Sequence, residues 1–187
     1  MLNREKAIEL LRTNVQENNL IKHSLSTEAV MRRLAERMGH DSEIWGLTGL
    51  LHDLDYTMTE NKPERHGLES ASMLKGELPP EAIRAIEAHA AEMNSSQPPA
   101  TDFDHALRCA ETLTGLIMAA ALVRPDRLSG MKAKSLKKKM KDKAFAASVN
   151  REIISEHKNL GLEQTEFLTL GIEAMQGVAK DIGLDQS

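Results

Sequence analysis

The sequence predicts an all-α protein, and its composition and patterning both support that prediction. Apolar residues make up 41 % of the 187 residues, whereas aromatic residues make up only 3 %. The core must therefore be built from Leu, Ile, Ala and ten Met, which favour helix, because strand-forming residues are scarce. Apolar residues also recur at helical spacing in one segment after another. The length fits one domain, or one domain with a helical appendage.

Six helical segments are expected before residue 124. In chain order they cover residues 2–13, 20–38, 41 or 42 to about 54, 66–75, 80 to beyond 89, and 103–123. Gly39 supplies a stop for the second helix, and Asp41 or Ser42 can cap the third. Pro79 and Pro80 open the fifth, since proline is preset for a first helical turn. The sixth is the longest apolar helix and is expected to be central.

Two polar segments between these helices are expected to be loops. Residues 56–65 are polar and contain Pro63, and residues 94–102 contain turn-forming Pro and Ser. Beyond the six helices, residues 148–184 again show helical patterns, with a break near Leu160.

A basic segment lies between these two parts of the chain. Residues 124–143 hold nine Lys or Arg against two acids, a net +7, so the remainder carries −11 of the total of −4. Such a run is usually a solvated face. The alternatives are a lid over an anionic substrate or a contact with an acidic partner.

Charge and cysteine content narrow the function classes. A net charge of −4 does not favour a nucleic-acid partner, and no apolar stretch is long enough to span a bilayer, so we expect no membrane partner. The single cysteine, Cys109, excludes an internal disulfide and is expected to be a small buried apolar residue. The first residues carry charges and no apolar run, so we expect no signal peptide and a cytoplasmic location.

An adjacent histidine and aspartate mark the candidate site. His52 and Asp53 lie in the otherwise apolar segment 49–54, which indicates a mostly buried helix. Burying these groups is unfavourable unless something pairs with them. Imidazole and carboxylate side by side suit a divalent metal. His23 precedes the pair on a predicted helix, and Glu111 follows it at the centre of the longest apolar helix.

The order of these residues resembles the HD-domain superfamily of metal-dependent phosphohydrolases, defined by H…HD…D, and most closely its small HDIG-type branch. The resemblance covers roughly residues 20–125. It implies an HD-type helical bundle in residues 1–125, with the basic segment and C-terminal helices of residues 126–187 packed on the same domain. In the family the matched positions bind one metal, which implies as ligands His23, His52, Asp53 and Glu111.

The resemblance also implies a second ion. His66 and His89 match positions that bind a second metal in dinuclear members, and in those members the signature aspartate, here Asp53, bridges both ions. We therefore expect one or two divalent ions, drawn from Fe, Mn, Co, Ni or Zn, which His and carboxylate sites accept.

Three positions depart from the family pattern. The last ligand is normally Asp, whereas this chain has Glu111, one methylene longer. The Gly-Lys that often follows the signature is Asp55-Tyr56, and the His-His of many dinuclear members is His89-Ala90.

The implied reaction is hydrolysis of a small phosphorylated substrate: a phosphomonoester, nucleotide or dinucleotide. A divalent ion lowers the pKa of bound water and clamps phosphate oxygens. Lys62 and Arg65 are expected to meet the phosphate charge from the loop before His66. The predicted catalytic residues are thus Asp53, Lys62 and Arg65. A homo-oligomer is left open.

Other interpretations stay open. Glu111 could instead be a buried structural acid, either capping or paired with an Arg such as Arg108, three residues before it. His40 is expected to be a capping or surface residue, and His105 and His157 to lie on the surface. At the level of function, the alternatives are a degenerate HD domain serving as a ligand sensor or interaction module, and a di-iron oxygenase of the HD type.

Overall fold

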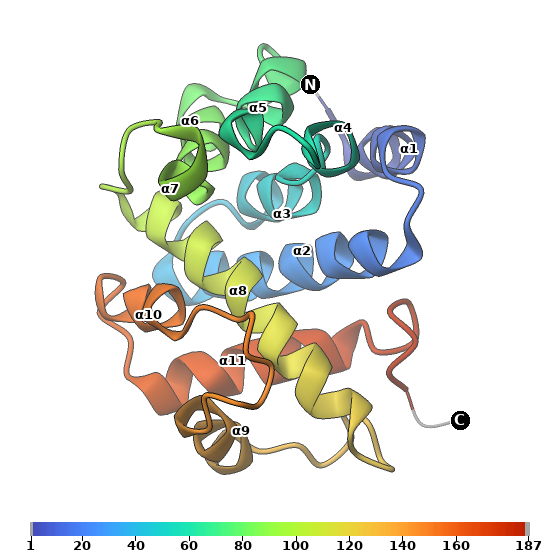
Figure 1. Cartoon of the computed structure of the whole chain (residues 1–187), viewed down its shortest axis with the longest axis vertical. Helices are drawn as coiled ribbons and strands as arrows, with labels where there is room; N and C mark the ends of the chain where they lie inside the picture. The colour runs from blue at the N-terminus through green and yellow to red at the C-terminus, as the bar shows by residue number, and fades with distance from the viewer. Residues whose placement is uncertain (1, 186–187) are drawn as a thin grey trace.

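The computed structural model describes residues 2–185, in which helices are present and β-strands are not (Figure 1). The all-α prediction is therefore confirmed. The helical elements, in chain order, are α1 (Arg4–Asn14), α2 (Asn18–Met38), α3 (Ser42–Leu51), α4 (Tyr56–Thr59), η1 (Pro63–Arg65), α5 (Leu68–Leu74), α6 (Pro80–His89), α7 (Ala91–Asn94), α8 (Asp102–Leu122), α9 (Ala133–Lys141), α10 (Arg151–Ile154), η2 (Ser155–Lys158) and α11 (Gln164–Gly177).

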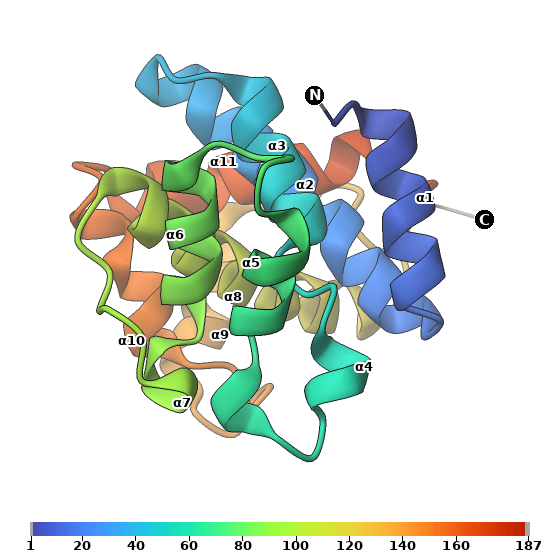
Figure 2. The same ribbon diagram turned by 90° about the horizontal axis from the view of Figure 1, so that it is seen from above.

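The core lies between the long helices α2 and α8 and the shorter helices packed on them. Helix α2 packs against α3, α8 and α11, and α8 also packs against α6. Helices α4 to α7 lie together on one side of α3 (Figure 1 and Figure 2). Gly49 permits the close approach of α3 to α2, because a Cβ there would lie 2.9 Å from the carbonyl oxygen of Thr27. This approach brings the end of α3 beside α2.

Helix ends follow the expected signals where those signals are local. Gly39 ends α2 in a left-handed conformation, with φ of 76°. The Asp41 side chain caps α3 by accepting hydrogen bonds from the backbone N–H groups of Glu43 and Ile44. Thr101 and Asp104 form a capping box at the start of α8. The prediction for Asp41 is confirmed.

Three predicted boundaries are wrong, all near the candidate site. The third helix ends at Leu51 rather than near Leu54, so the His-Asp pair lies in the turn that follows it. Segment 56–65 is not a plain loop, because it contains α4 and η1. The next helix begins at Leu68, after Gly67 with φ of 79°, and His66 precedes it.

The C-terminal part of the chain packs on the helices that precede it. Helix α11 contacts α2, α8 and α9, and Arg37 on α2 pairs with Glu166 on α11 at 2.6 Å. The division between residues 1–125 and 126–187 stays a prediction.

Within residues 2–185, none of the helices combines the length and apolar character needed to cross a membrane.

Candidate metal centre

Four histidine side chains converge on the Asp53 carboxylate. His23 comes from α2, and His52 directly follows the last residue of α3. His66 lies two residues before the start of α5, and His89 lies in the last turn of α6. The Nε2 atom of His23 lies 3.6 Å from Asp53 Oδ2, and the Nε2 atoms of the other three each lie 3.4 Å from Asp53 Oδ1. Asp53 and three of the histidines are buried, and His23 is partly exposed.

These side chains form two groups that share Asp53. Within each group one donor atom per residue lies within 4.8 Å of the others. The Nε2 atoms of His23 and His52 are 3.3 Å apart, and those of His66 and His89 are 3.2 Å apart. Neighbouring donors bound at about 2.0–2.1 Å to one ion are themselves about 2.8–3.0 Å apart in an octahedron and about 3.3–3.4 Å apart in a tetrahedron. Both groups therefore fit a divalent ion.

Backbone carbonyls fix the tautomer of two histidines. Nδ1 of His52 lies 2.8 Å from the carbonyl oxygen of Gly49, and Nδ1 of His89 lies 2.6 Å from that of Ile86. A carbonyl can only accept, so each Nδ1 carries the proton and donates it. In the neutral ring Nε2 then presents a lone pair to Asp53, which is the form that binds a metal.

Side chains fix the other two histidines in the same way. Nδ1 of His66 donates to Asp55 Oδ1 at 2.8 Å. Nδ1 of His23 lies 3.1 Å from the Thr114 hydroxyl, which itself donates to the carbonyl oxygen of Glu111 at 2.7 Å. The Thr114 oxygen therefore accepts from His23. In its neutral form each of the four imidazoles would thus present a lone pair toward a carboxylate, an arrangement of acceptors that a cation satisfies.

Burial and charge set the protonation of this cluster. Burial lowers the pKa of His52 to about 3, so this ring is neutral at physiological pH. Burial alone would raise the pKa of Asp53, but the imidazoles of His52, His89 and His23 outweigh it and hold that pKa well below its usual value. Burial lowers the pKa of His89, but the hydrogen bond and charge of Asp53 outweigh it and raise that pKa. A metal bound at Nε2 of His89 would compete with a proton for that nitrogen.

Asp55 is a residue of the candidate site that the sequence interpretation missed. Its side chain is fully buried and accepts from His66 and, at 2.9 Å, from the backbone N–H of Ser70. Burial opposes ionisation, but these two hydrogen bonds outweigh it and lower the Asp55 pKa. The carboxylate is thus placed to orient His66, a candidate metal ligand. The sequence did offer a signal for Asp55, because this carboxylate lies two residues after Asp53. The sequence interpretation treats it only as a departure from the Gly-Lys of the family pattern.

Glu111 faces the same cavity but belongs to neither donor group. Its carboxylate accepts from the Thr112 hydroxyl at 2.5 Å, and burial raises its pKa against the opposing effect of His23. Arg108, the alternative partner, pairs with Glu92 and Glu156 instead, so the expected pairing of Glu111 with Arg108 is wrong. The role of Glu111 as a ligand stays a prediction.

A cavity of about 550 Å³ opens onto the two donor groups. Its lining comes from both parts of the chain: Leu20, His23, Asp53, Tyr56, His66, His89, Ala90, Glu92, Met93, Glu111, Ser148, Asn150 and Ile153. The expected phosphate contacts, Lys62 and Arg65, are not among these residues. Both are exposed, and Arg65 pairs with Glu69. The structure therefore does not place them at the cavity.

The remaining predictions for single residues have mixed outcomes. His40 is exposed, as expected, and stacks on Trp45. His157 is buried rather than on the surface, and its Nδ1 donates to the carbonyl oxygen of Leu162 at 2.8 Å, which satisfies this buried nitrogen. His105 is partly buried and pairs with Glu156 at 2.9 Å. Cys109 is fully buried, as expected, and burial raises its pKa well above the usual value.

Comparison with known proteins gives one match. The family model described as HD domain matches residues 20–144, which is 125 of the 187 residues and includes every residue of the two donor groups. No curated protein and no solved structure matches the chain.

Proposed function

We propose that this chain, which belongs to the HD domain family, is a metal-dependent phosphohydrolase acting on a phosphomonoester, nucleotide or dinucleotide. The observation that carries the proposal is the pair of adjacent donor groups sharing the Asp53 carboxylate. Divalent ions held there would lower the pKa of a water molecule and neutralise phosphate oxygens in the transition state.

The residues of the chain prepare this site in three ways. The hydrogen bonds at each Nδ1 hold the imidazoles in the tautomer that can bind metal. Asp53 stays ionised and lies between the two groups, where it can bind both ions. The partly exposed His23 lines the cavity, from which water and substrate could reach a metal ion held there.

The metal and substrate are proposed at the level of chemical class. Mixed imidazole and carboxylate groups suit one or two ions of Fe, Mn, Co, Ni or Zn. The cavity lining contains neither Lys nor Arg, so the substrate phosphate would rely on the metal ions for charge neutralisation. Membership of the HDIG-type branch, a small phosphorylated substrate and a cytoplasmic location remain predictions from the sequence.

A second candidate is a di-iron oxygenase, which the shared carboxylate favours because it suits two adjacent irons. The sensor interpretation loses one of its two supports. One support was Asp55-Tyr56, which replaces the Gly-Lys of the family pattern. Asp55 accepts a hydrogen bond from His66 and orients its ring, so this departure supports a metal centre.

The test combines metal analysis with a substrate screen. The protein is purified without added metal, its metal content is measured, and phosphomonoesters and phosphodiesters are screened with each candidate metal, with and without oxygen. We expect release of phosphate or of a phosphomonoester that is lost in Asp53→Asn, a variant of nearly equal shape. Oxygen consumption without hydrolysis would favour the oxygenase, and failure to bind any of these metals would favour the sensor.

A further inference from the structure

Residues 142–150, between α9 and α10, form a wall of the cavity at the metal centre, and we call them the wall segment. Ser148 and Asn150 of this segment line the cavity beside the candidate metal ligands. Figure 1 shows the wall segment running across α8. A Cβ added at Gly115 of α8 would lie 3.6 Å from Cγ2 of Val149. Gly115 lies four residues after Glu111 and shares its helix face, so the wall segment packs beside a candidate ligand.

One arginine holds the wall segment in shape. The Arg151 guanidinium donates hydrogen bonds to four backbone carbonyl oxygens, at 2.6 Å to those of Ala146 and Val149, at 3.3 Å to that of Asp142, and also to that of Phe145. Ala146 has a φ of 46°, in the left-handed region that is unfavourable for alanine. Such a conformation persists only where the surrounding contacts hold it. Arg151 therefore imposes a shape that the backbone of the segment does not prefer.

Asn150 has one end of its amide fixed and the other end available. Its Oδ1 caps α10 by accepting hydrogen bonds from the backbone N–H groups of Glu152 at 2.9 Å and Ile153 at 3.3 Å. Because a backbone N–H can only donate, the atom that faces it is the amide oxygen. Within residues 2–185 the amide nitrogen of Asn150 donates to no acceptor. It is therefore available to a molecule in the cavity that Asn150 lines.

The cavity offers a phosphate few hydrogen-bond donors. Its lining contains no Lys or Arg, and its donors other than histidine are Tyr56, Ser148 and Asn150. Metal ions at the two donor groups would neutralise the phosphate oxygens directed toward them. An oxygen directed away from the ions needs a hydrogen-bond donor instead, because an unpaired polar group out of water is unfavourable. The amide nitrogen of Asn150 can supply that donor.

We propose that the Asn150 amide donates a hydrogen bond to a phosphate oxygen of the bound substrate, and that Arg151 is the positioning residue that holds Asn150 in place. This inference rests on the proposed function, since it assigns a contact to the phosphate of that substrate. The contact adds no charge, so it complements the metal ions and does not replace them.

Calorimetric titration of inorganic phosphate into the manganese-loaded protein tests the contact. Asn150→Asp keeps the capping oxygen and the shape but replaces the donor with a second carboxylate oxygen. We expect phosphate to bind at least about tenfold more weakly, and manganese affinity to stay within about twofold. Asn150→Ser also keeps a capping oxygen but adds no charge, so its expected loss of about fivefold isolates the missing donor.

The matched control makes the same change at a cap elsewhere. Asn3 caps α1 by accepting from the backbone N–H of Lys6, so Asn3→Asp alters an equivalent side chain away from the cavity. Its phosphate affinity should equal that of the wild type. Equal affinity in Asn150→Asp and Asn3→Asp would overturn the inference and leave the proposed function standing.

A second set of variants tests the positioning role. Arg151→Lys keeps the charge but cannot reach the same set of carbonyl oxygens, and should weaken phosphate binding about fivefold. Combining it with Asn150→Asp should cost little more, because Arg151 acts through Asn150. Arg124→Lys is the control, since Arg124 donates to the carbonyl oxygens of Arg127 and Ser129 in a segment outside the cavity. Fully additive losses in the double variant would overturn the role of Arg151.

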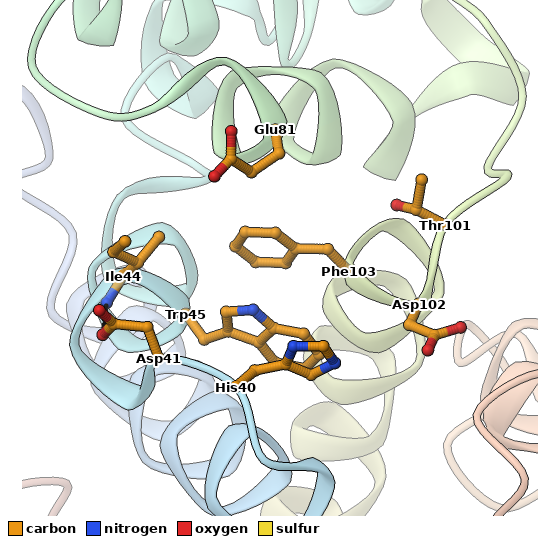
Figure 3. Close-up of a pocket in the computed structure, with 8 residues that line it drawn as sticks. All are labelled: His40, Asp41, Ile44, Trp45, Glu81, Thr101, Asp102 and Phe103. Atoms are coloured by element: carbon orange, nitrogen blue, oxygen red, sulfur yellow. Dashed lines mark hydrogen bonds between the residues drawn. The ribbon is translucent and has the colours of Figure 1, made fainter.

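Trp45 shows whether each variant is folded. It is the only tryptophan of the chain and lies in a separate cavity beside His40 and Phe103 (Figure 3). Its fluorescence during urea unfolding therefore reports folding and not phosphate binding. Wild-type protein that binds manganese but no phosphate would overturn both the proposed function and this inference.

Discussion

Nδ1 of His66 donates a hydrogen bond to the fully buried carboxylate of Asp55 across 2.8 Å. The same carboxylate accepts from the backbone N–H of Ser70, so it is fixed at two points. Carboxylates that bind the remote nitrogen of a metal-binding histidine fix its ring orientation and raise its basicity. Asp55 therefore acts on the proposed metal centre through His66.

Asp55→Asn keeps the shape of the side chain but removes its charge and one acceptor oxygen. We expect metal affinity at the His66 and His89 group to fall by about 10- to 100-fold. Calorimetric titration with manganese or cobalt measures this. Glu69→Gln is the matched control, since it removes a nearby carboxylate that binds Arg65 rather than a histidine. Unchanged affinity in Asp55→Asn would mean that Asp55 only supports the local fold.

Alanine variants of the histidines should separate two ions. His66→Ala removes a donor from one group and His23→Ala from the other, so each should lose one ion when two bind the wild type. Asp53→Ala removes the shared carboxylate and should lose both. Elemental analysis of protein purified in excess metal gives the stoichiometry, and exposed His40→Ala is the control. Equal losses of both ions in His23→Ala and His66→Ala would contradict two separable sites.

The helices could be predicted from sequence because periodicity and caps are local. Residues 20–38 were expected as a helix, and α2 covers Asn18–Met38. The predicted helix 103–123 corresponds to α8, Asp102–Leu122. The turns around the metal centre were not predictable in this way. His66 lies before α5 because Gly67 adopts a positive φ. That conformation depends on the tertiary structure and leaves no periodic signal in the sequence.

The donor residues could be named from their order, but their supporting contacts could not. Asp55 and His66 are brought together by the intervening segment, whose conformation includes α4 and η1. Arg108 was considered as a partner of Glu111 because of their helical spacing. Its real partners, Glu92 and Glu156, come from segments 16 residues before it and 48 after it. Such pairings depend on how whole helices pack.

The metal-free protein should lose stability as the pH falls from about 6.5 to about 3, because of His52. An unfolded histidine has a pKa of about 6.5, whereas burial lowers that of His52 to about 3. Between these values the unfolded chain binds a proton that the folded chain does not, so stability is full above pH 6.5 and declines below it. Urea unfolding of chelated protein across this range measures the decline.

His89 supplies an internal comparison for the pH series. Its pKa is raised in the folded protein, so its contribution is full below about 6.5 and is lost as the pH rises through the folded pKa. His52→Gln should therefore flatten the decline below pH 6.5, whereas His89→Gln should leave that decline unchanged and remove only the stability that is lost as the pH rises above about 6.5. The same slope in both variants would show that other groups control the acid response.

Arg108 should contribute strongly to stability. Its buried guanidinium donates to the carbonyl oxygens of Ala88 and His89 and pairs with Glu92 and Glu156. Arg108→Met keeps the stem but leaves these acceptors unpaired. We expect the free energy of unfolding to fall by about 3 kcal/mol, the low end of the range for a broken buried pair. The low end applies because the Glu92 side chain is 62 % exposed.

Urea unfolding tests this against a surface pair. Arg37→Met breaks the exposed pair with Glu166 and should change stability by at most about 1 kcal/mol. Arg108→Lys should recover part of the loss, because it restores charge without the full set of donors. Equal effects of Arg108→Met and Arg37→Met would show that the Arg108 network adds little.

Glu111 should complete the donor group of His23 and His52 when metal is present. Its carboxylate faces the cavity, and burial raises its pKa, because burial disfavours the charged form. A metal ion would favour the charged form instead. Glu111→Gln keeps the shape and removes the charge, and we expect metal affinity at this group to fall by about tenfold or more.

Glu111→Asp tests whether reach matters as well as charge. It restores the residue usual in the family but shortens the arm by one methylene, while the backbone of Glu111 is held by the Thr114 hydroxyl that also accepts from His23. The carboxylate then cannot move closer without disturbing His23, so this variant should also retain less metal than wild type. Chelation should lower the melting temperature less in both variants than in wild type. If Glu111→Gln binds metal as tightly as wild type, Glu111 is a structural acid, and water or another residue completes the site.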